Sequence, residues 1–185
     1  IQEAHARGIR ILVDWVGNHV HEEHAWYTDH PDWFTSQHLC EDEDNWNQAT
    51  ETCWFAPYVP TLDYSQTGPI VENIEDAIEF AIQYDIDGFR VDAVKHMPMA
   101  VHWNLERQIQ NKIEHTDLGQ TMEFYTVGET FSGDRGLLAS YVDETLLDGQ
   151  FDFAVYWSLL DVIGRNQGSM IDLENTYFES ADFFE

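Results

Sequence analysis

Short apolar runs alternate with helical patterns along the chain. One apolar run of strand length begins at Ile9, and similar runs follow further along. Between them, apolar residues recur three or four positions apart, as at Ile70, Ile74 and Ile78, which is the spacing of one helix face. The predicted strands are 9–13, 87–93, 124–127 and 150–153, and the predicted helices are 1–7, 68–84, 100–114, 137–142 and 155–163.

Strands that alternate with helices at this pace predict a parallel sheet with right-handed crossovers. One segment breaks the alternation, since residues 19–67 are irregular and rich in His, Asp, Trp and Pro. A loop of this length is normally functional or forms a small subdomain. We therefore expect a main α/β domain over 1–18 and 68–185, with an inserted domain over 19–67.

Polar side chains gather directly after the predicted strands. Asp14 and His19 follow the first strand, Asp92 closes the second and Glu129 follows the third. Active sites of (β/α)8 barrels lie at the C-terminal ends of the strands, and doubly wound sheets bind ligands at the same edge. No glycine-rich phosphate loop follows any of these strands, which favours the barrel. The 185 residues would form about half of a typical barrel, so the predicted fold class is α/β, a partial (β/α)8 TIM barrel.

Charge excludes several classes of function. The chain has 8 Lys+Arg and 35 Asp+Glu, a formal net charge of −27, which repels nucleic acid and anionic membrane surfaces. No stretch approaches the roughly 18 apolar residues of a membrane span. Such a charge favours a protein from a salty, halophilic environment, because high salt screens the repulsion. An ordinary acidic secreted enzyme is the alternative.

Asp92, Glu129 and Arg90 are the strongest candidates for chemistry. Glycosidic cleavage takes two carboxyl groups on either side of the anomeric carbon, one ionised and one protonated. Retaining enzymes hold them about 5–5.5 Å apart, close to the spacing of neighbouring strand ends. Arg90 lies two residues before Asp92, on the same strand face, where its charge favours an ionised nucleophile. A structural salt bridge and a helix-capping glutamate are the alternative.

Three segments, in this order, resemble sequence regions of the α-amylase family of retaining α-glucan hydrolases. They are DWVGNH at 14–19, GFRVDAVKH at 88–96 and VGE at 127–129, and VPTLD at 59–63 resembles a fourth region. The resemblance spans nearly the whole chain. It implies the third to sixth strands of the barrel, with the family's small domain B at 19–67.

The resemblance also implies a role for each matching residue. Asp92 would be the nucleophile and Glu129 the general acid/base in double-displacement hydrolysis of α-1,4-glucosidic bonds in starch-like polysaccharides. The implied substrate contacts are Arg90 beside the nucleophile, His19 on a sugar hydroxyl, and Lys95 and His96 on the leaving-group side. The Lys95-His96 pair is typical of α-amylases. Cyclomaltodextrinases or neopullulanases, α-glucosidases, glucanotransferases and non-catalytic carbohydrate-binding relatives are the alternatives within the family.

Cys40 and Cys53 lie in the irregular segment. By themselves they fit either a local disulfide of an exported protein or two free thiols. The resemblance implies the domain B disulfide of fungal-type α-amylases, and with it an extracellular location.

A calcium ion is implied in the same way. In fungal-type relatives it is held at the positions of Asn18, Glu51 and His96, partly through main-chain oxygens, which are ligands that suit Ca²⁺. The family's calcium-binding aspartate would fall at Thr61, which brings no charge. Calcium is therefore an expectation that this one departure weakens.

Two further groups of residues have alternative interpretations. Trp54 and Tyr58 are expected to stack on glucose rings, or else to form the core of the inserted domain. His19, His21 and His24 have the spacing of zinc-binding histidines in metal-dependent hydrolases, but that interpretation leaves the carboxylates after the other strands unexplained.

The family's last region, which supplies a third catalytic carboxylate, would follow Glu185. We therefore expect the chain alone to be inactive on starch. We also expect its open barrel edges to permit self-association, because unpaired strand edges are templates for pairing.

Overall fold

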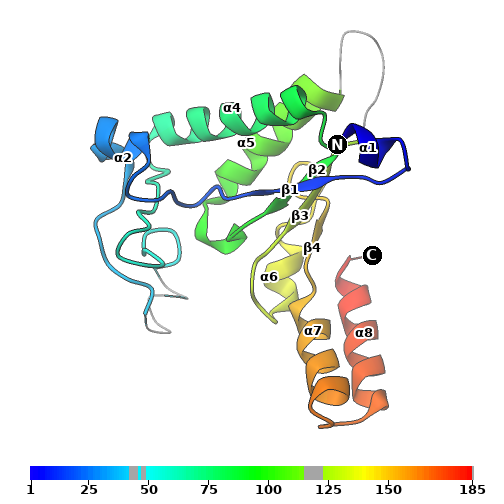
Figure 1. Cartoon of the computed structure of the whole chain (residues 1–185). Helices are drawn as coiled ribbons and strands as arrows, with labels where there is room; N and C mark the ends of the chain where they lie inside the picture. Colours follow the sequence, from blue (N-terminus) through cyan, green and yellow to red (C-terminus); the bar gives the residue numbers. More distant parts are fainter. Residues whose placement is uncertain (42–45, 47–48, 115–122, 185) are drawn as a thin grey trace.

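A parallel four-stranded sheet forms the centre of the protein in a computed structural model that describes residues 1–41, 46, 49–114 and 123–184 (Figure 1). The strands lie side by side in chain order: β1 (Leu12–Trp15), β2 (Gly88–Val91), β3 (Tyr125–Gly128) and β4 (Gly149–Gln150). The helical elements are α1 (Gln2–His5), α2 (Ala25–Asp29), η1 (Pro31–Trp33), α4 (Thr67–Tyr84), η2 (Val94–His96), α5 (Met99–Ile109), η3 (Gln110–Glu114), α6 (Arg135–Ala139), α7 (Phe153–Leu159), η4 (Leu160–Gly164) and α8 (Met170–Phe184). Parallel strands joined by helices confirm the predicted α/β class.

The first strand begins later than the apolar pattern indicates. Its ladder to β2 starts at the pair Leu12–Gly88 and ends at Trp15–Val91. Ile9 precedes the ladder and is 52% exposed. The apolar run therefore predicted where β1 lies, whereas the residues at which β1 begins and ends depend on its pairing with β2.

The last predicted strand, 150–153, was wrong at its C-terminal end. β4 stops at Gln150, and the side chain of Asp152 instead accepts a hydrogen bond from the backbone N–H of Val155, which caps α7. An aspartate at this position favours a helix start, because it satisfies one of the free N–H groups of the first turn. Helix α8 was not predicted at all.

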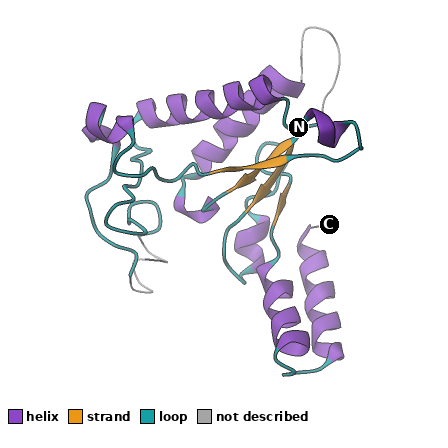
Figure 2. Cartoon of the chain, in the orientation of Figure 1, coloured by secondary structure: helices purple, strands orange, loops and turns teal. Residues whose placement is uncertain are grey.

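Side chains alternate between a buried and an open face of the sheet. Trp15, Phe89 and Val91 are buried in the core shared with α4 and α5, which lie on one side of the sheet (Figure 2). On the other face, Leu12 and Tyr125 are 40% and 47% exposed. The inner face of a barrel sheet is the one without helices. The open face therefore corresponds to the barrel interior.

The segment between β1 and α4 is held by isolated contacts rather than by long strands in its described part. A bridge between His19 and Thr61 joins its two ends, and further bridges lie between them. The disulfide predicted between Cys40 and Cys53 is confirmed, with their Cα atoms 5.2 Å apart. These contacts return the chain to the C-terminal edge of the sheet.

Helices α7 and α8 form a hairpin that extends away from the sheet (Figure 1). Its apolar side chains are exposed, among them Leu159 at 41%, Met170 at 63% and Ile171 at 66%. Even so, none of the described helices is both long enough and apolar enough to cross a membrane.

A buried carboxyl group lies under the sheet on α5. Glu106 is 8% exposed, and burial raises its pKa to about 7. A hydrogen bond from the side chain of Gln110 opposes this shift, whereas the charges of Asp148 and Glu114 add to it. The folded protein therefore holds a proton on Glu106 at a pH where the unfolded chain has lost it.

Replacing Glu106 by Gln should stabilise the protein more at pH 8 than at pH 5. A raised carboxyl pKa contributes stability below about pH 4.5 that is lost as the pH rises toward 7, and Gln removes this dependence. The difference should be on the order of 2 to 3 kcal/mol, because one pKa unit corresponds to about 1.4 kcal/mol. Thermal unfolding of both proteins at the two pH values measures it.

The control is Glu75→Gln, which makes the same change of charge at an exposed position on α4. The change that Glu75→Gln causes in the free energy of unfolding should be the same at both pH values within about 0.5 kcal/mol. Equal effects of the two substitutions would contradict the burial argument.

Candidate active site

One guanidinium group binds three carboxylates at the C-terminal edge of the sheet. Nη1 of Arg90 lies 2.6 Å from Oδ1 of Asp14 and 2.6 Å from Oδ1 of Asp92. Nη2 lies 2.5 Å from Oε2 of Glu129. Burial alone would lower the pKa of Arg90, but the hydrogen bond to Asp14 and the charges of Asp92 and Glu129 outweigh it and raise the pKa. Arg90 is thus a fixed positive charge among three acids.

Strand register sets this arrangement. Asp14 is the direct partner of Arg90 across β1 and β2. Val91 pairs with Gly128 across β2 and β3, so Asp92 and Glu129 each follow a paired residue. Since neighbouring strands lie about 4.8 Å apart, the backbones of the two acids are held at about that distance.

Backbone hydrogen bonds continue the ladder past the strand ends. The N–H of Asp92 donates to the carbonyl of Trp15 at 3.0 Å, and the N–H of Glu129 donates to that of Val91 at 2.8 Å. The side chains of Asp92 and Glu129 are 18% and 29% exposed, so both are accessible while their main chains are fixed.

A left-handed residue follows the first of these acids. Ala93 has φ = 51°, a conformation that costs a residue with a Cβ atom about 1 kcal/mol. It turns the chain into η2, which carries Lys95 and His96. The turn brings both of these residues to the same edge as Asp92.

The two site histidines are held neutral. Burial lowers the pKa of His19, and the charge of Asp92 opposes this only in part. Burial also lowers the pKa of His96 to about 4, although a hydrogen bond to the Thr50 carbonyl opposes it. Nε2 of His96 is buried and has no hydrogen-bond partner among the described residues. A neutral imidazole can donate a hydrogen bond to a sugar hydroxyl through one ring nitrogen or accept one through the other.

A cleft of about 270 Å³ opens beside these groups. Its walls are aromatic: Phe55 makes edge contacts with His19 and His96, with ring centroids 5.1 and 4.7 Å apart. Nζ of Lys95 lies 4.7 Å from the centre of the Trp46 ring. The residues that line the cleft are Trp46, Phe55, Asp92, Ala93, His96, Glu129, Thr130 and Phe131.

One predicted aromatic contact needs correction. Trp54 is only 4% exposed and donates a hydrogen bond to Thr35, so it packs inside the inserted segment and presents no stacking face. Tyr58 is 52% exposed, but it lies beside His21 and does not line the cleft. Phe131, which no sequence pattern singled out, is 51% exposed and does line the cleft.

The zinc interpretation is wrong for the described residues. Nδ1 of His21 and Nδ1 of His24 accept local backbone hydrogen bonds, and these two histidines do not converge with His19. The group of possible ligands that does converge is Cys40, Cys53 and His96, but both cysteines are in the disulfide.

The expected calcium ligands fit an ion only in part. Oδ1 of Asn18 is an oxygen acceptor that is fully buried and without a hydrogen-bond donor in the described structure, as a cation ligand would be. Thr61 is equally buried, but its hydroxyl donates to the carbonyl of Cys53. Glu51 is exposed, and the family resemblance implies main-chain oxygens as part of the ligand set. Oxygen ligands are the type that Ca²⁺ prefers, but Asn18 and the main-chain oxygens are uncharged and Thr61 adds no negative charge.

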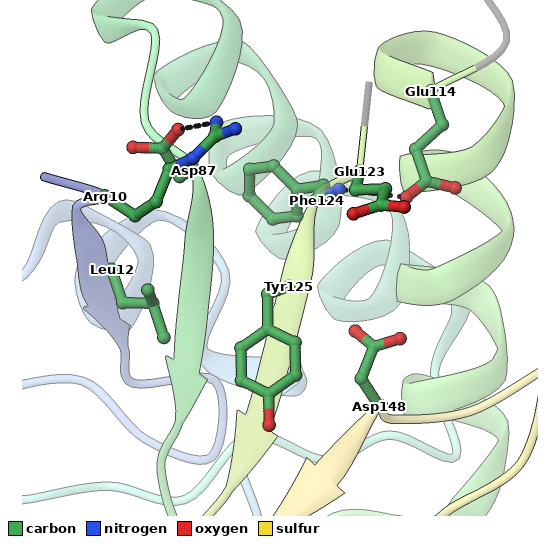
Figure 3. Close-up of a pocket in the computed structure, with 8 residues that line it drawn as sticks. All are labelled: Arg10, Leu12, Asp87, Glu114, Glu123, Phe124, Tyr125 and Asp148. Atoms are coloured by element: carbon green, nitrogen blue, oxygen red, sulfur yellow. Dashed lines mark hydrogen bonds and ion pairs between the residues drawn. The ribbon is translucent and has the colours of Figure 1, made fainter. Parts of the chain in front are cut away.

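A larger hollow, of about 510 Å³, lies at the opposite edge of the sheet (Figure 3). It contains the Arg10–Asp87 ion pair, with Leu12 and Tyr125 at the first positions of their strands. Sites in (β/α)8 barrels lie at the other end of the strands. The smaller cleft beside Asp92 is therefore the candidate active site.

Comparison with known proteins assigns the chain to a family. Residues 1–182 match the family model described as the alpha amylase catalytic domain. Alpha-amylase 1 of Lipomyces kononenkoae is 30% identical over 184 residues, which cover 92% of the chain and 27% of that protein. The human amino acid transporter heavy chain SLC3A1 is 26% identical over an alignment that covers 88% of the chain and 32% of that protein.

Solved structures show the same fold. An Anoxybacillus alpha-amylase matches the whole chain with a TM-score of 0.84 and 25% identity, over 39% of its own length. The alpha-amylase of Geobacillus thermoleovorans in complex with acarbose matches 87% of the chain with a TM-score of 0.74 and 26% identity, over 34% of its length. The chain thus spans about a quarter to two fifths of these relatives, and the partial-barrel prediction is confirmed. It belongs to the α-amylase family of glycoside hydrolases, as a portion of the catalytic domain.

Proposed function

We propose that the protein carrying this chain hydrolyses α-1,4-glucosidic bonds of starch-like glucans with retention of configuration. The observation that supports this most is the placement of Asp92 and Glu129 on neighbouring strand ends, on two nitrogens of one guanidinium. The retaining mechanism takes two carboxyl groups close together at one anomeric carbon, and strand ends about 4.8 Å apart bring the two side chains near enough for that. A double displacement assigns a different task to each of them.

In the first step, a carboxylate oxygen of Asp92 attacks the anomeric carbon, and the bond from that carbon to the leaving oxygen breaks. Glu129 gives its proton to the leaving oxygen, so no free alkoxide forms. In the second step, Glu129 takes a proton from water, and the water oxygen displaces Asp92 from the sugar. Both carboxyl groups return to their starting states.

Arg90 holds both carboxyl groups in place, because its Nη1 lies 2.6 Å from Oδ1 of Asp92 and its Nη2 lies 2.5 Å from Oε2 of Glu129. The two groups therefore keep a fixed placement for attack on one face of the anomeric carbon and proton transfer at the leaving oxygen.

The cleft walls suit a glucan. Phe55, Trp46 and Phe131 offer apolar ring faces to the apolar faces of sugars. His96 also lines the cleft and His19 contacts Phe55 beside it, so we assign both neutral imidazoles to sugar hydroxyls. We assign Lys95 to the leaving-group side, where its contact with Trp46 orients it. The acarbose complex of the Geobacillus relative supports an oligosaccharide ligand.

Related activities are the nearest alternatives, because the relatives include a trehalose synthase/amylase and a transporter heavy chain. The intact pair Asp92 and Glu129 favours catalysis over a purely structural role. The product profile of the full-length protein on soluble starch separates hydrolysis, transfer and no reaction.

In the full-length protein, Asp92→Asn and Glu129→Gln should each reduce kcat on starch by about 10³-fold or more, because each removes a group that both steps need. Asp76→Asn, on the exposed side of α4, is the control and should keep wild-type activity. Initial rates of reducing-sugar release measure all three. Near-normal rates in either site variant would reject the assignment.

We also propose a calcium ion at Asn18, with main-chain oxygens of Glu51 and His96 as further ligands and a structural role for the ion. The unpartnered buried Oδ1 of Asn18 supports this. Loss of a bound ion lowers stability because the ion binds the folded state only.

EGTA should lower the melting temperature of the wild type by several degrees, and Asn18→Ala should abolish that sensitivity. Thr61→Asp should tighten calcium binding by about tenfold or more. The substitution replaces the hydroxyl of the buried Thr61 with a negatively charged carboxylate. Calorimetric titration of calcium into EGTA-treated protein measures the affinities. A wild type whose melting ignores EGTA would argue against the ion.

We further propose that the protein is exported into a salty medium. The net charge of −27 and the Cys40–Cys53 disulfide support this. The melting temperature should rise by several degrees between 0.05 M and 2 M NaCl, as screening removes self-repulsion. A melting temperature that falls or stays constant over this range would contradict it.

A further inference from the structure

The peptide groups of Val94 connect both candidate catalytic residues to helix α5. The N–H of Val94 donates to the carbonyl of Glu129 at 3.0 Å, and Val94 follows Asp92 by two residues. The carbonyl of Val94 lies 3.0 Å from Nε2 of His102, on α5. Because a carbonyl only accepts, Nε2 of His102 carries the proton and donates it.

His102 is itself held firmly. It is fully buried, and its ring meets that of Tyr141 edge to face, with centroids 5.5 Å apart. Burial lowers its pKa to about 4, although the hydrogen bond to Val94 opposes this, so the imidazole is neutral at neutral pH. The donor to Val94 therefore has a defined tautomer.

The turn that His102 holds needs such support. Ala93, between Asp92 and Val94, has φ = 51°, a region that residues with a Cβ atom rarely adopt. A sparsely populated conformation persists only where the surroundings fix it. Here the Glu129 contact fixes one side of Val94. The His102 contact, helped by the N–H of Met97 at 3.2 Å, fixes the other.

We propose that His102 is a positioning residue for glycosidic cleavage. It touches neither the substrate nor a reacting atom, and it acts through Val94 to hold Asp92 in a fixed orientation relative to Glu129. This inference rests on the proposed function, because it concerns the geometry of the same two carboxyl groups.

Three substitutions of His102 in the full-length protein separate positioning from simple packing. Gln places an amide N–H close to the position of Nε2, so His102→Gln should keep the bond to Val94. His102→Asn keeps a polar amide that is too short, and His102→Leu removes the donor. Leu105→Ala is the matched control, because Leu105 is fully buried on the same helix and belongs to the main core.

Steady-state kinetics on soluble starch at 25 °C and thermal melting give the readouts. His102→Asn and His102→Leu should lower kcat by about 10- to 100-fold with KM within about twofold, since small misplacements of catalytic groups are costly. His102→Gln should keep kcat within about threefold of the wild type. Leu105→Ala should lower the melting temperature while kcat stays within about twofold.

Wild-type kcat in His102→Leu or His102→Asn would overturn the inference. So would an equal loss of kcat in Leu105→Ala, or a failure of Gln to restore what Asn loses. If His102→Leu does not fold, the comparison of Gln with Asn decides. A wild type without activity on any α-glucan rejects the proposed function and this inference together. An active wild type with an unaffected His102→Leu rejects this inference alone.

Discussion

Arg90 and its three carboxylates impose the constraint on which the site depends. Asp14, Asp92 and Glu129 lie on three adjacent strand ends in a protein of net charge −27, so without a cation they would repel one another. One guanidinium has enough donors, in a planar arrangement, to bind all three. A lysine would offer a point charge at best. Arg90 thereby offsets the repulsion among the three carboxylates and holds them together at this edge of the sheet.

The surrounding structure is built outward from that edge. Ladder bonds fix the main chains of the acids, the strained turn at Ala93 aims η2, and the inserted segment brings Phe55 against both site histidines. The disulfide and the His19–Thr61 bridge bring this segment back to the sheet. The cleft therefore has one wall from the sheet edge and one from the insertion.

The sequence predicted the features that depend on residues close together in the chain, and those carried by residues directly after a strand. Sequence patterns located β1, β2 and β3, and the position of Asp92 and Glu129 directly after two of these strands placed both acids in the candidate site. The disulfide was also anticipated. For the two acids the strand pattern was sufficient, because neighbouring strands bring their ends together. For the cysteines the residues alone left two free thiols open, and the family resemblance implied the disulfide.

Features that depend on tertiary contacts were missed. Trp54 and Phe131 are both large aromatics in loops, yet one is buried against Thr35 and the other opens onto the cleft, and composition does not distinguish them. The true end of β4 depends on whether Asp152 pairs in a ladder or caps a helix. Phe131 directly follows Glu129 and Thr130, and this proximity was the available signal.

The open face of the sheet has a consequence for how such a protein can diverge. Contacts that hold Asp92 and Glu129 come from β1, β2, β3 and α5, and none of those named above involves the exposed side chains of Leu12 or Tyr125. Substitutions of Leu12 and Tyr125, at the first positions of their strands, can then change that part of the open face without removing a contact of the carboxylate cluster. Asp14 and Arg90 share the same face nearer the C-terminal ends of the strands, and they have no such freedom because they hold the cluster together.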